Sequence, residues 1–233
     1  MTGGHLTDVL ADVREDLKDR VADPAWLDEA ERRVTQDPAA IAALFPAVGR
    51  RCGRGPLPGT GPGPAGWSVD DAARVLLLTA LPLRGAALAE QVGTLYRYGG
   101  AAEKRAVLRA LPGLDIGSGA VDLLHDAIRT NDPRLVAAAV GPYARHLDDG
   151  MWRQAVLKCV FMDISLTAVA DLDRRADGEL ARMLADLDDE RRAAGRTMPD
   201  DAIALLALIG DPMPARSGER APARPGEREE EAV

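Results

Sequence analysis

The chain has 233 residues, enough for one domain, and a domain of this size buries roughly 70% of the surface that its unfolded chain exposes. Hydrophobic residues make up 46% of the sequence but aromatic residues only 3%, so the core is built from Leu, Ala and Val, which favours an all-α fold. The net charge of −8 and the lack of a basic stripe exclude nucleic acid as an expected partner. The longest apolar run, Val75 to Leu81, is much shorter than the ~20 residues of a membrane span. We therefore expect a cytoplasmic protein with no integral membrane segment.

Cysteine and histidine are too sparse to indicate a metal site or a disulfide framework. Cys52 and Cys159 are far apart, and His5, His125 and His146 have no second ligand at a suitable spacing. No Ser, Cys or Thr stands in a recognisable nucleophile motif, and the glycine-rich segment lacks the Lys that completes a P-loop. We expect no metal, no cofactor and no catalysis.

Helix signals begin near the N-terminus. Apolar residues recur at helical spacing from Leu6 to Leu17. Three Asp-Pro pairs, at residues 23–24, 37–38 and 132–133, each place an N-cap before a proline at the first helical position. These signals predict short helices joined by tight turns.

A segment crowded with glycine and proline, residues 48–66, interrupts the helical pattern. It contains Gly-Pro-Leu-Pro-Gly and Gly-Pro-Gly-Pro, in which no regular element is expected, so we predict a long flexible loop. Directly after it, Ser68 and Asp71 have the spacing of a capping box and predict a helix that continues to Leu81.

Seven further helices are expected in the rest of the chain, at about residues 84–98, 101–111, 119–130, 133–140, 151–162, 178–194 and 200–209. Antiparallel helix pairs with short turns are typical of α-solenoids, although no clean sequence repeat is present. We predict an all-α, HEAT-like helical array that forms a single domain over residues 1–210. Residues 211–233 are rich in Pro, Arg and Glu and cannot bury enough surface to offset their ordering entropy, so this tail is expected to be disordered.

The predicted helix 151–162 carries Gln154 and Lys158 four residues apart, although apolar residues cover nearly its whole circumference. We expect this helix to be central. A buried Lys must meet a carboxylate, for which Glu190 is the first candidate and Asp126 the second. Two interpretations stay open: a buried pair that fixes the helix register, or a contact with a ligand.

Arg191 falls in the middle of the apolar stripe of the predicted helix 178–194. A guanidinium at that position must be paired. We therefore expect Arg191 to be at least half buried, against a carboxylate or against carbonyls at a neighbouring helix end. Gly195, followed by Pro199, is a helix stop.

Other polar residues have simple structural interpretations. Arg129 shares a helix face with Asp122 and Asp126, which can pair with it locally. Asn131 can take the left-handed conformation that ends a helix, while Asp132 caps the next one.

Three aromatic residues belong to the same half of the chain. Tyr143 follows the helix-breaking Gly141-Pro142 and could line a groove or plug one. Trp152 and Phe161 are expected to fill core.

Several motifs in a fixed order resemble the EboA family. They are Arg-Thr-Asn at 129–131, Pro-Tyr at 142–143, Gln-Ala-Val-Leu-Lys at 154–158 and a charged segment at 190–196, and the likeness extends upstream to Asp-Asp-Ala-Ala-Arg at 70–74 and Glu-Lys-Arg-Ala-Val-Leu at 103–108. The sequence departs from the family pattern at Gly141, Arg153 and Asp177, where asparagine is usual.

The resemblance implies a helical, HEAT-like, non-catalytic protein that helps to move lipophilic natural-product precursors out of the cytoplasm. It implies as companions a UbiA-like membrane prenyltransferase, a TatD-like hydrolase and sugar-isomerase-like proteins. The function that follows is an adaptor or carrier for a lipophilic or prenylated metabolite. The alternatives are a pure protein scaffold, and an isomerase or hydrolase that acts through Lys158 and Glu190 at the floor of a pocket. The candidate polar cluster that would bind a ligand or stabilise the fold is Arg129, Asn131, Tyr143, Gln154, Lys158, Glu190, Arg191 and Arg196.

Overall fold

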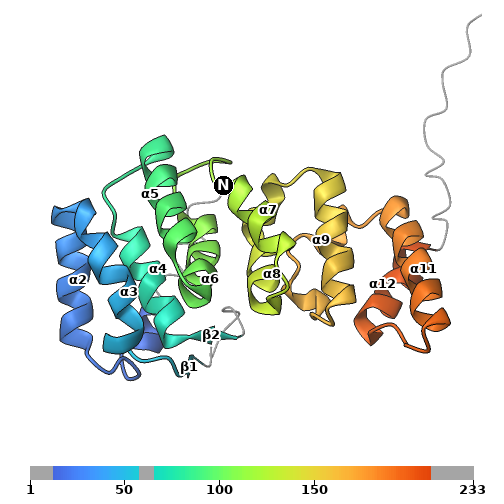
Figure 1. Ribbon diagram of the computed structural model, residues 1–233, viewed down its shortest axis with the longest axis horizontal. Coiled ribbons are helices and arrows are strands. Elements are labelled where there is room, and N and C mark those ends of the chain that lie inside the picture. The colour runs from blue at the N-terminus through green and yellow to red at the C-terminus, as the bar shows by residue number, and fades with distance from the viewer. Residues whose placement is uncertain (1–12, 58–65, 211–233) are drawn as a thin grey trace, which may run out of the picture.

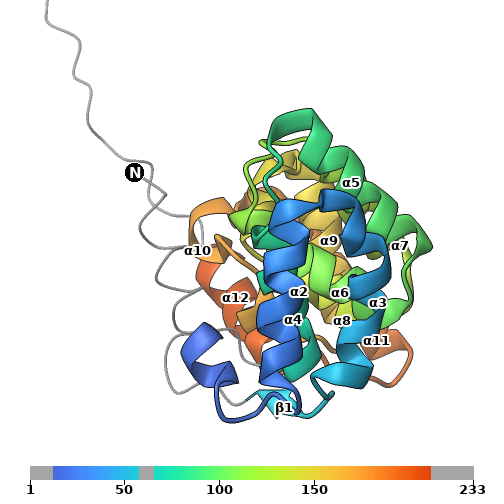
Figure 2. The ribbon, with the colours of Figure 1, turned by 90° about the vertical axis from the view of Figure 1, so that its left-hand side faces the viewer.

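The computed structural model describes residues 13–57 and 66–210, and their architecture is all-α, as predicted. The helices follow one another along the long axis of an elongated molecule, from α2 at one end to α11 and α12 at the other (Figure 1). Viewed along that axis from the α2 end, α2 and α3 lie in front of the helices that follow (Figure 2). The finer prediction, a HEAT-like array of regular repeats, stays a prediction.

The α-helices are α2 (Pro24–Gln36), α3 (Ile41–Arg51), α4 (Val69–Thr79), α5 (Gly85–Tyr98), α6 (Ala101–Ala110), α7 (Val121–Arg129), α8 (Pro133–Ala139), α9 (Asp149–Phe161), α10 (Leu172–Arg175), α11 (Gly178–Ala193) and α12 (Asp200–Gly210). Short 3-10 helices are η1 (Pro38–Ala40), η2 (Leu111–Gly113), η3 (Pro142–His146) and η4 (Leu166–Ala168). The seven helices predicted after residue 81 are all present, each with ends close to those expected. No helix in the described part of the chain is long and apolar enough to cross a membrane.

The three Asp-Pro pairs start helical turns, as the sequence predicts. The Asp23 carboxylate accepts a hydrogen bond from the Trp26 N–H, and Asp132 accepts one from the Arg134 N–H. Asp37 caps the short η1, which leads directly into α3.

The prediction that residues 48–66 form no regular element was wrong for residues 48–51 and 56–57. Helix α3 continues to Arg51, because its buried face packs on α4. Strand β1 (Pro56–Leu57) pairs antiparallel with β2 (Trp67–Ser68), which leads into α4. The middle of the predicted loop, residues 58–65, lies outside the described residues, as do the first predicted helix up to residue 12 and the predicted tail, 211–233.

The most deeply buried helix is α4, whose residues from Val69 to Leu78 are all buried. It packs against α2, α3 and α6, and α6 in turn packs against α5 and α8. The expectation that helix 151–162 is central was therefore wrong. Helix α9 buries one face, against α8 and α11, and Phe161 at its end is 63% exposed rather than part of the core.

Candidate functional site

Two acids and an arginine are buried within the apolar helix α4: Asp70, Asp71 and Arg74. The spacing of four residues places Asp70 and Arg74 on one face, where Arg74 Nη1 donates to Asp70 Oδ2 at 2.6 Å. Arg74 Nε also donates to the Phe45 carbonyl of α3 at 3.2 Å. The buried guanidinium is therefore paired, and it joins α4 to α3.

The Asp71 carboxylate joins α4 to α6. Arg105 and Arg109, four residues apart on α6, donate to it at 3.0 Å from Nε and at 2.6 Å from Nη1. Its Oδ2 also accepts the Ser68 backbone N–H at 3.2 Å, so the predicted contact from Asp71 back to the N-cap is present. Since Arg105 Nη2 donates to Ser68 Oγ at 3.1 Å, one network connects β2, α4 and α6.

The ionisation of this network follows from burial and hydrogen bonding. Burial acts to raise the pKa of Asp70, but hydrogen bonds from Ser68 and Arg74 outweigh it and hold that pKa below its ordinary value. Burial lowers the pKa of Arg109, against the opposing charge of Asp71. Asp70 is therefore charged at neutral pH. Within residues 13–57 and 66–210, no group of three or more His, Cys, Asp or Glu side chains is placed to hold a metal ion.

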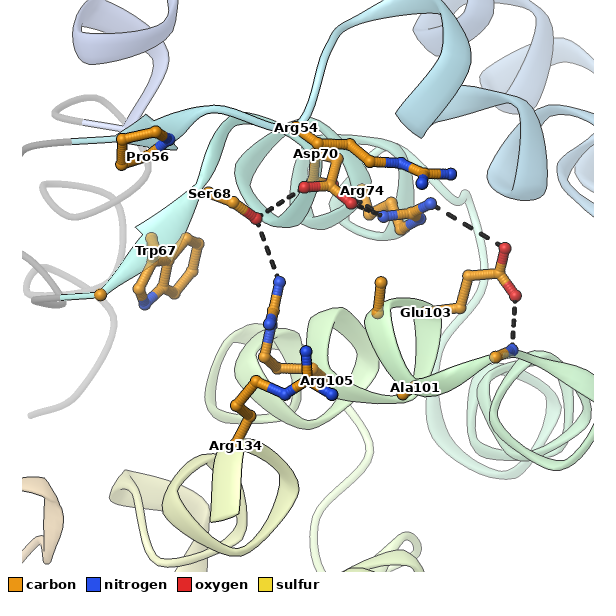
Figure 3. Close-up of a pocket in the computed structure, with 13 residues that line it drawn as sticks. Arg54, Pro56, Trp67, Ser68, Asp70, Arg74, Ala101, Glu103, Arg105 and Arg134 are labelled. Atoms are coloured by element: carbon orange, nitrogen blue, oxygen red, sulfur yellow. Dashed lines mark hydrogen bonds and ion pairs between the residues drawn. The ribbon is translucent and has the colours of Figure 1, made fainter. Parts of the chain in front are cut away.

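A pocket of about 620 Å³ lies beside this network. Figure 3 shows Pro56 and Trp67 of the strands at one side of it, Arg74 and Glu103 at the other, and Arg134 at the N-terminal end of α8. A volume of this size is within the range of small-molecule sites. The pocket lies where the β1–β2 pair, α4 and the first turn of α6 meet.

The charge of the pocket is opposite to that of the chain. Four arginines line it against two acids, Asp70 and Glu103, while the whole chain carries −8. The Glu103 carboxylate accepts the Gly100 N–H at 2.7 Å and lies 3.9 Å from Arg74 Nη2. Both acids are thus engaged with protein groups, and Arg74 contacts both.

The residues chosen from the sequence lie elsewhere, in the second half of the array. Arg129 is exposed and pairs with Asp126 at 3.8 Å, as the local interpretation predicts. Asn131 is exposed and is not left-handed, so that prediction was wrong. The turn is made instead by Thr130, whose Oγ1 donates to the Ala127 carbonyl at 2.8 Å and accepts the Asp132 N–H at 3.3 Å.

Tyr143 is buried and acts as a plug. Its hydroxyl donates to the Gly117 carbonyl at 2.7 Å and accepts the Ala120 N–H at 3.1 Å. Burial raises the pKa of this phenol. The side chain therefore ties η3 to the start of α7.

The predicted pairing of Lys158 with Glu190 was wrong. Gln154, Glu190 and Arg196 are exposed, and no carboxylate of the described residues lies within 4.0 Å of the half-buried Lys158. Asp126, the second choice, instead accepts the Tyr96 hydroxyl at 3.0 Å. Helix α9 is not surrounded on all sides, so its Lys does not need a buried acid.

The prediction for Arg191 is confirmed. Its side chain is 11% exposed, and it donates to the Thr197 carbonyl at 2.9 Å, to the Val160 carbonyl at 3.4 Å and to Asp163 at 3.1 Å. Val160 and Asp163 lie at the C-terminal end of α9, so the guanidinium joins that helix end to α11. None of the eight chosen residues lines the pocket.

The residues of the pocket and of the buried ion-pair network were not among the candidates chosen from the sequence, although the sequence carries a signal for the network. Asp70, Asp71 and Arg74 interrupt an apolar run, and Arg105 and Arg109 repeat a four-residue spacing. The capping box accounts for Asp71 but not for Asp70 or Arg74. A buried charge needs a partner, and for this network part of the partners lie on another helix, which the sequence does not identify.

An all-α fold with a cationic pocket, whose own acids are held in ion pairs, places the chain among all-helical proteins. The chain belongs to the EboA family, because the family described as metabolite traffic protein EboA matches residues 13–207. The matched range includes α4, α6 and every described residue of the pocket. Comparisons with curated proteins and with solved structures found no match.

Proposed function

We propose that the protein is a non-catalytic carrier or adaptor in metabolite traffic, that it works in the cytoplasm, and that its cargo occupies the pocket between α4 and α6. The observation that carries this proposal is the pocket of about 620 Å³, built from segments that belong to the family match. A metabolite-sized pocket favours a carrier over a pure scaffold, which needs only an outer face.

The state of the acids supports binding rather than catalysis. A general base needs a carboxylate that can reach the substrate and a pKa near the working pH. Asp70 is held by Ser68 and Arg74 with its pKa below the ordinary value, and Asp71 is held by two arginines. Lys158 and Glu190 do not line the pocket, which also disfavours the isomerase or hydrolase alternative.

The cargo we propose is a lipophilic precursor that passes to a membrane partner such as a UbiA-like prenyltransferase. Pro56, Trp67, Ala101 and Ala102 give the pocket apolar contacts beside its charges. An apolar part of a cargo would pack there, with the tryptophan ring as the largest surface.

The test is native mass spectrometry of the full chain purified from its own cells. Ala102→Trp places an indole at the pocket wall, and Ala185→Trp makes the same change at an exposed position of α11. We expect the wild type and Ala185→Trp to carry a small molecule, and Ala102→Trp to lose at least nine-tenths of it with an unchanged melting temperature. Cargo retained in Ala102→Trp, or absent from all three proteins, would contradict the proposal and favour the scaffold.

A further inference from the structure

We propose that the pocket between α4 and α6 recognises its cargo by an anionic head group, a carboxylate or a phosphate, held by Arg54, Arg134 and the first turn of α6. This inference rests on the proposed function and specifies its ligand. It follows from the positive charges of the pocket that are not neutralised by ion pairs within the protein.

Among the four arginines that line the pocket, Arg54 is the one without an ion pair to a described residue. Its side chain is exposed and lines the pocket, and no carboxylate of residues 13–57 or 66–210 lies within 4.0 Å of it. The neighbouring segment 58–65 contains no acidic residue. Helix α3 supports the guanidinium at Gly49, where an added Cβ would lie 2.7 Å from Arg54 Nε. The glycine therefore leaves room for the side chain along the helix.

The first turn of α6 adds backbone donors. Ala101 and Ala102 line the pocket, and N–H groups in the first turn of a helix have no acceptor within it. Their methyl side chains leave this backbone accessible. The N-terminal end of the helix dipole also favours an anion.

The remaining charges complete the balance. Arg74 pairs with Asp70 and Glu103, and Arg105 and Arg109 both pair with Asp71, so these three arginines and three acids neutralise one another. Arg134 lines the pocket while it also pairs with Asp132 at 2.7 Å. Arg54 and Arg134 are thus the cations that can turn to a ligand. A cargo with an anionic head and an apolar body fits the arginines together with Pro56 and Trp67.

The experiment compares three probes of equal chain length, decanoate, decyl phosphate and decanol, by calorimetric titration of the full chain at low ionic strength. We expect at least one anion to bind at least tenfold more tightly than decanol, and the preference to shrink as salt is added. The stronger of the two anions identifies the head group as carboxylate or phosphate. Equal affinity for decanol and both anions would overturn the proposal.

Three variants test the residues. Arg54→Gln combined with Arg134→Gln removes two exposed charges and should weaken anion binding at least tenfold without changing decanol binding. Gly49→Ala, which displaces the Arg54 side chain and keeps its charge, should weaken anion binding several-fold. Arg182→Gln removes an equally exposed charge on α11 and should change neither. Anion affinity that stays at the wild-type value in the double variant would refute the assignment.

The two proposals fail separately. Loss of cargo in Ala102→Trp together with anions that bind no better than decanol refutes only the head group. Cargo retained in Ala102→Trp refutes the pocket as the cargo site, whatever the probes do.

Discussion

At the scale of single residues, Asp71 is the position where we expect the largest loss of stability. Asp71→Asn keeps the shape of the side chain but leaves the mostly buried Arg105 and Arg109 without a carboxylate. Breaking a buried pair from one side costs roughly 3 to 5 kcal/mol, so we expect a decrease of that size in the free energy of unfolding, measured in urea.

The matched control for Asp71 is Asp186→Asn. Asp186 is exposed and pairs with Arg182 on the surface of α11. Exposed pairs contribute about 0 to 1 kcal/mol, so this variant should unfold close to the wild type. Equal losses in the two variants would show that Asp71 does not hold α4 to α6.

The lowered pKa of Asp70 predicts a dependence of stability on pH. A carboxyl whose pKa is lower in the folded state stabilises the protein above its unfolded pKa, about 3.9, and the contribution is lost as pH falls through the folded pKa. In unfolding measurements from pH 7 to pH 3, Asp70→Asn should be less stable than the wild type at pH 7. The difference should narrow below about pH 4. A difference that is constant or widens in acid would be inconsistent with the ion pair to Arg74.

At the scale of elements, Arg191 joins the end of α9 to the end of α11. Arg191→Leu removes donors to two carbonyls and to Asp163, and a hydrogen bond from a charged group contributes roughly 1.5 to 3 kcal/mol. We expect the variant to fold and to lose about 1 to 3 kcal/mol of stability.

The neighbouring Arg192 provides the comparison for Arg191. Its side chain is 69% exposed and pairs with Asp188 on its own helix, so Arg192→Leu should change stability by no more than about 0.5 kcal/mol. If Arg191→Leu melts like Arg192→Leu, the bridge between α9 and α11 is not a stabilising contact. Under the proposed function, retention of the cargo should survive both substitutions, because neither residue lines the pocket.

At the scale of the whole molecule, packing passes from each helix to its neighbours along the array, from α4 through α6, α8 and α9 to α11 and α12. The ion pairs between helices, Asp71 with Arg105 and Arg109 and Arg191 with Asp163, connect elements that are neighbours in this order. A substitution in α11 is therefore not expected to alter the pocket. For this reason the control variants are placed on α11.

The composition of residues 211–233 gives a prediction for the whole chain. A chain that ends at Pro214 lacks a segment rich in Pro, Arg and Glu. We expect its helical circular dichroism to be unchanged and its melting temperature to stay within about 2 °C of the full chain, the scale of a few tenths of a kcal/mol. A larger decrease would mean that the tail packs against the helices.

The sequence by itself determined the helical class, most helix positions and the pairing of Arg191. Helix periodicity, Asp-Pro caps and glycine stops act within a few residues, so each can be recognised locally. The burial and pairing of Arg191 could be predicted because a charge inside an apolar stripe must be paired. That prediction did not require the partner residue to be identified.

Only the tertiary structure decided which polar residues meet. The apolar residues around Lys158 in its helix predicted a buried pair with Glu190, yet α9 is covered on one face and needs none. Asp71, by contrast, finds Arg105 and Arg109 more than thirty residues away, because α4 packs on α6. Burial and pairing depend on which helix faces come together. The apolar periodicity of one helix shows which of its faces is buried, but not which helix packs against that face.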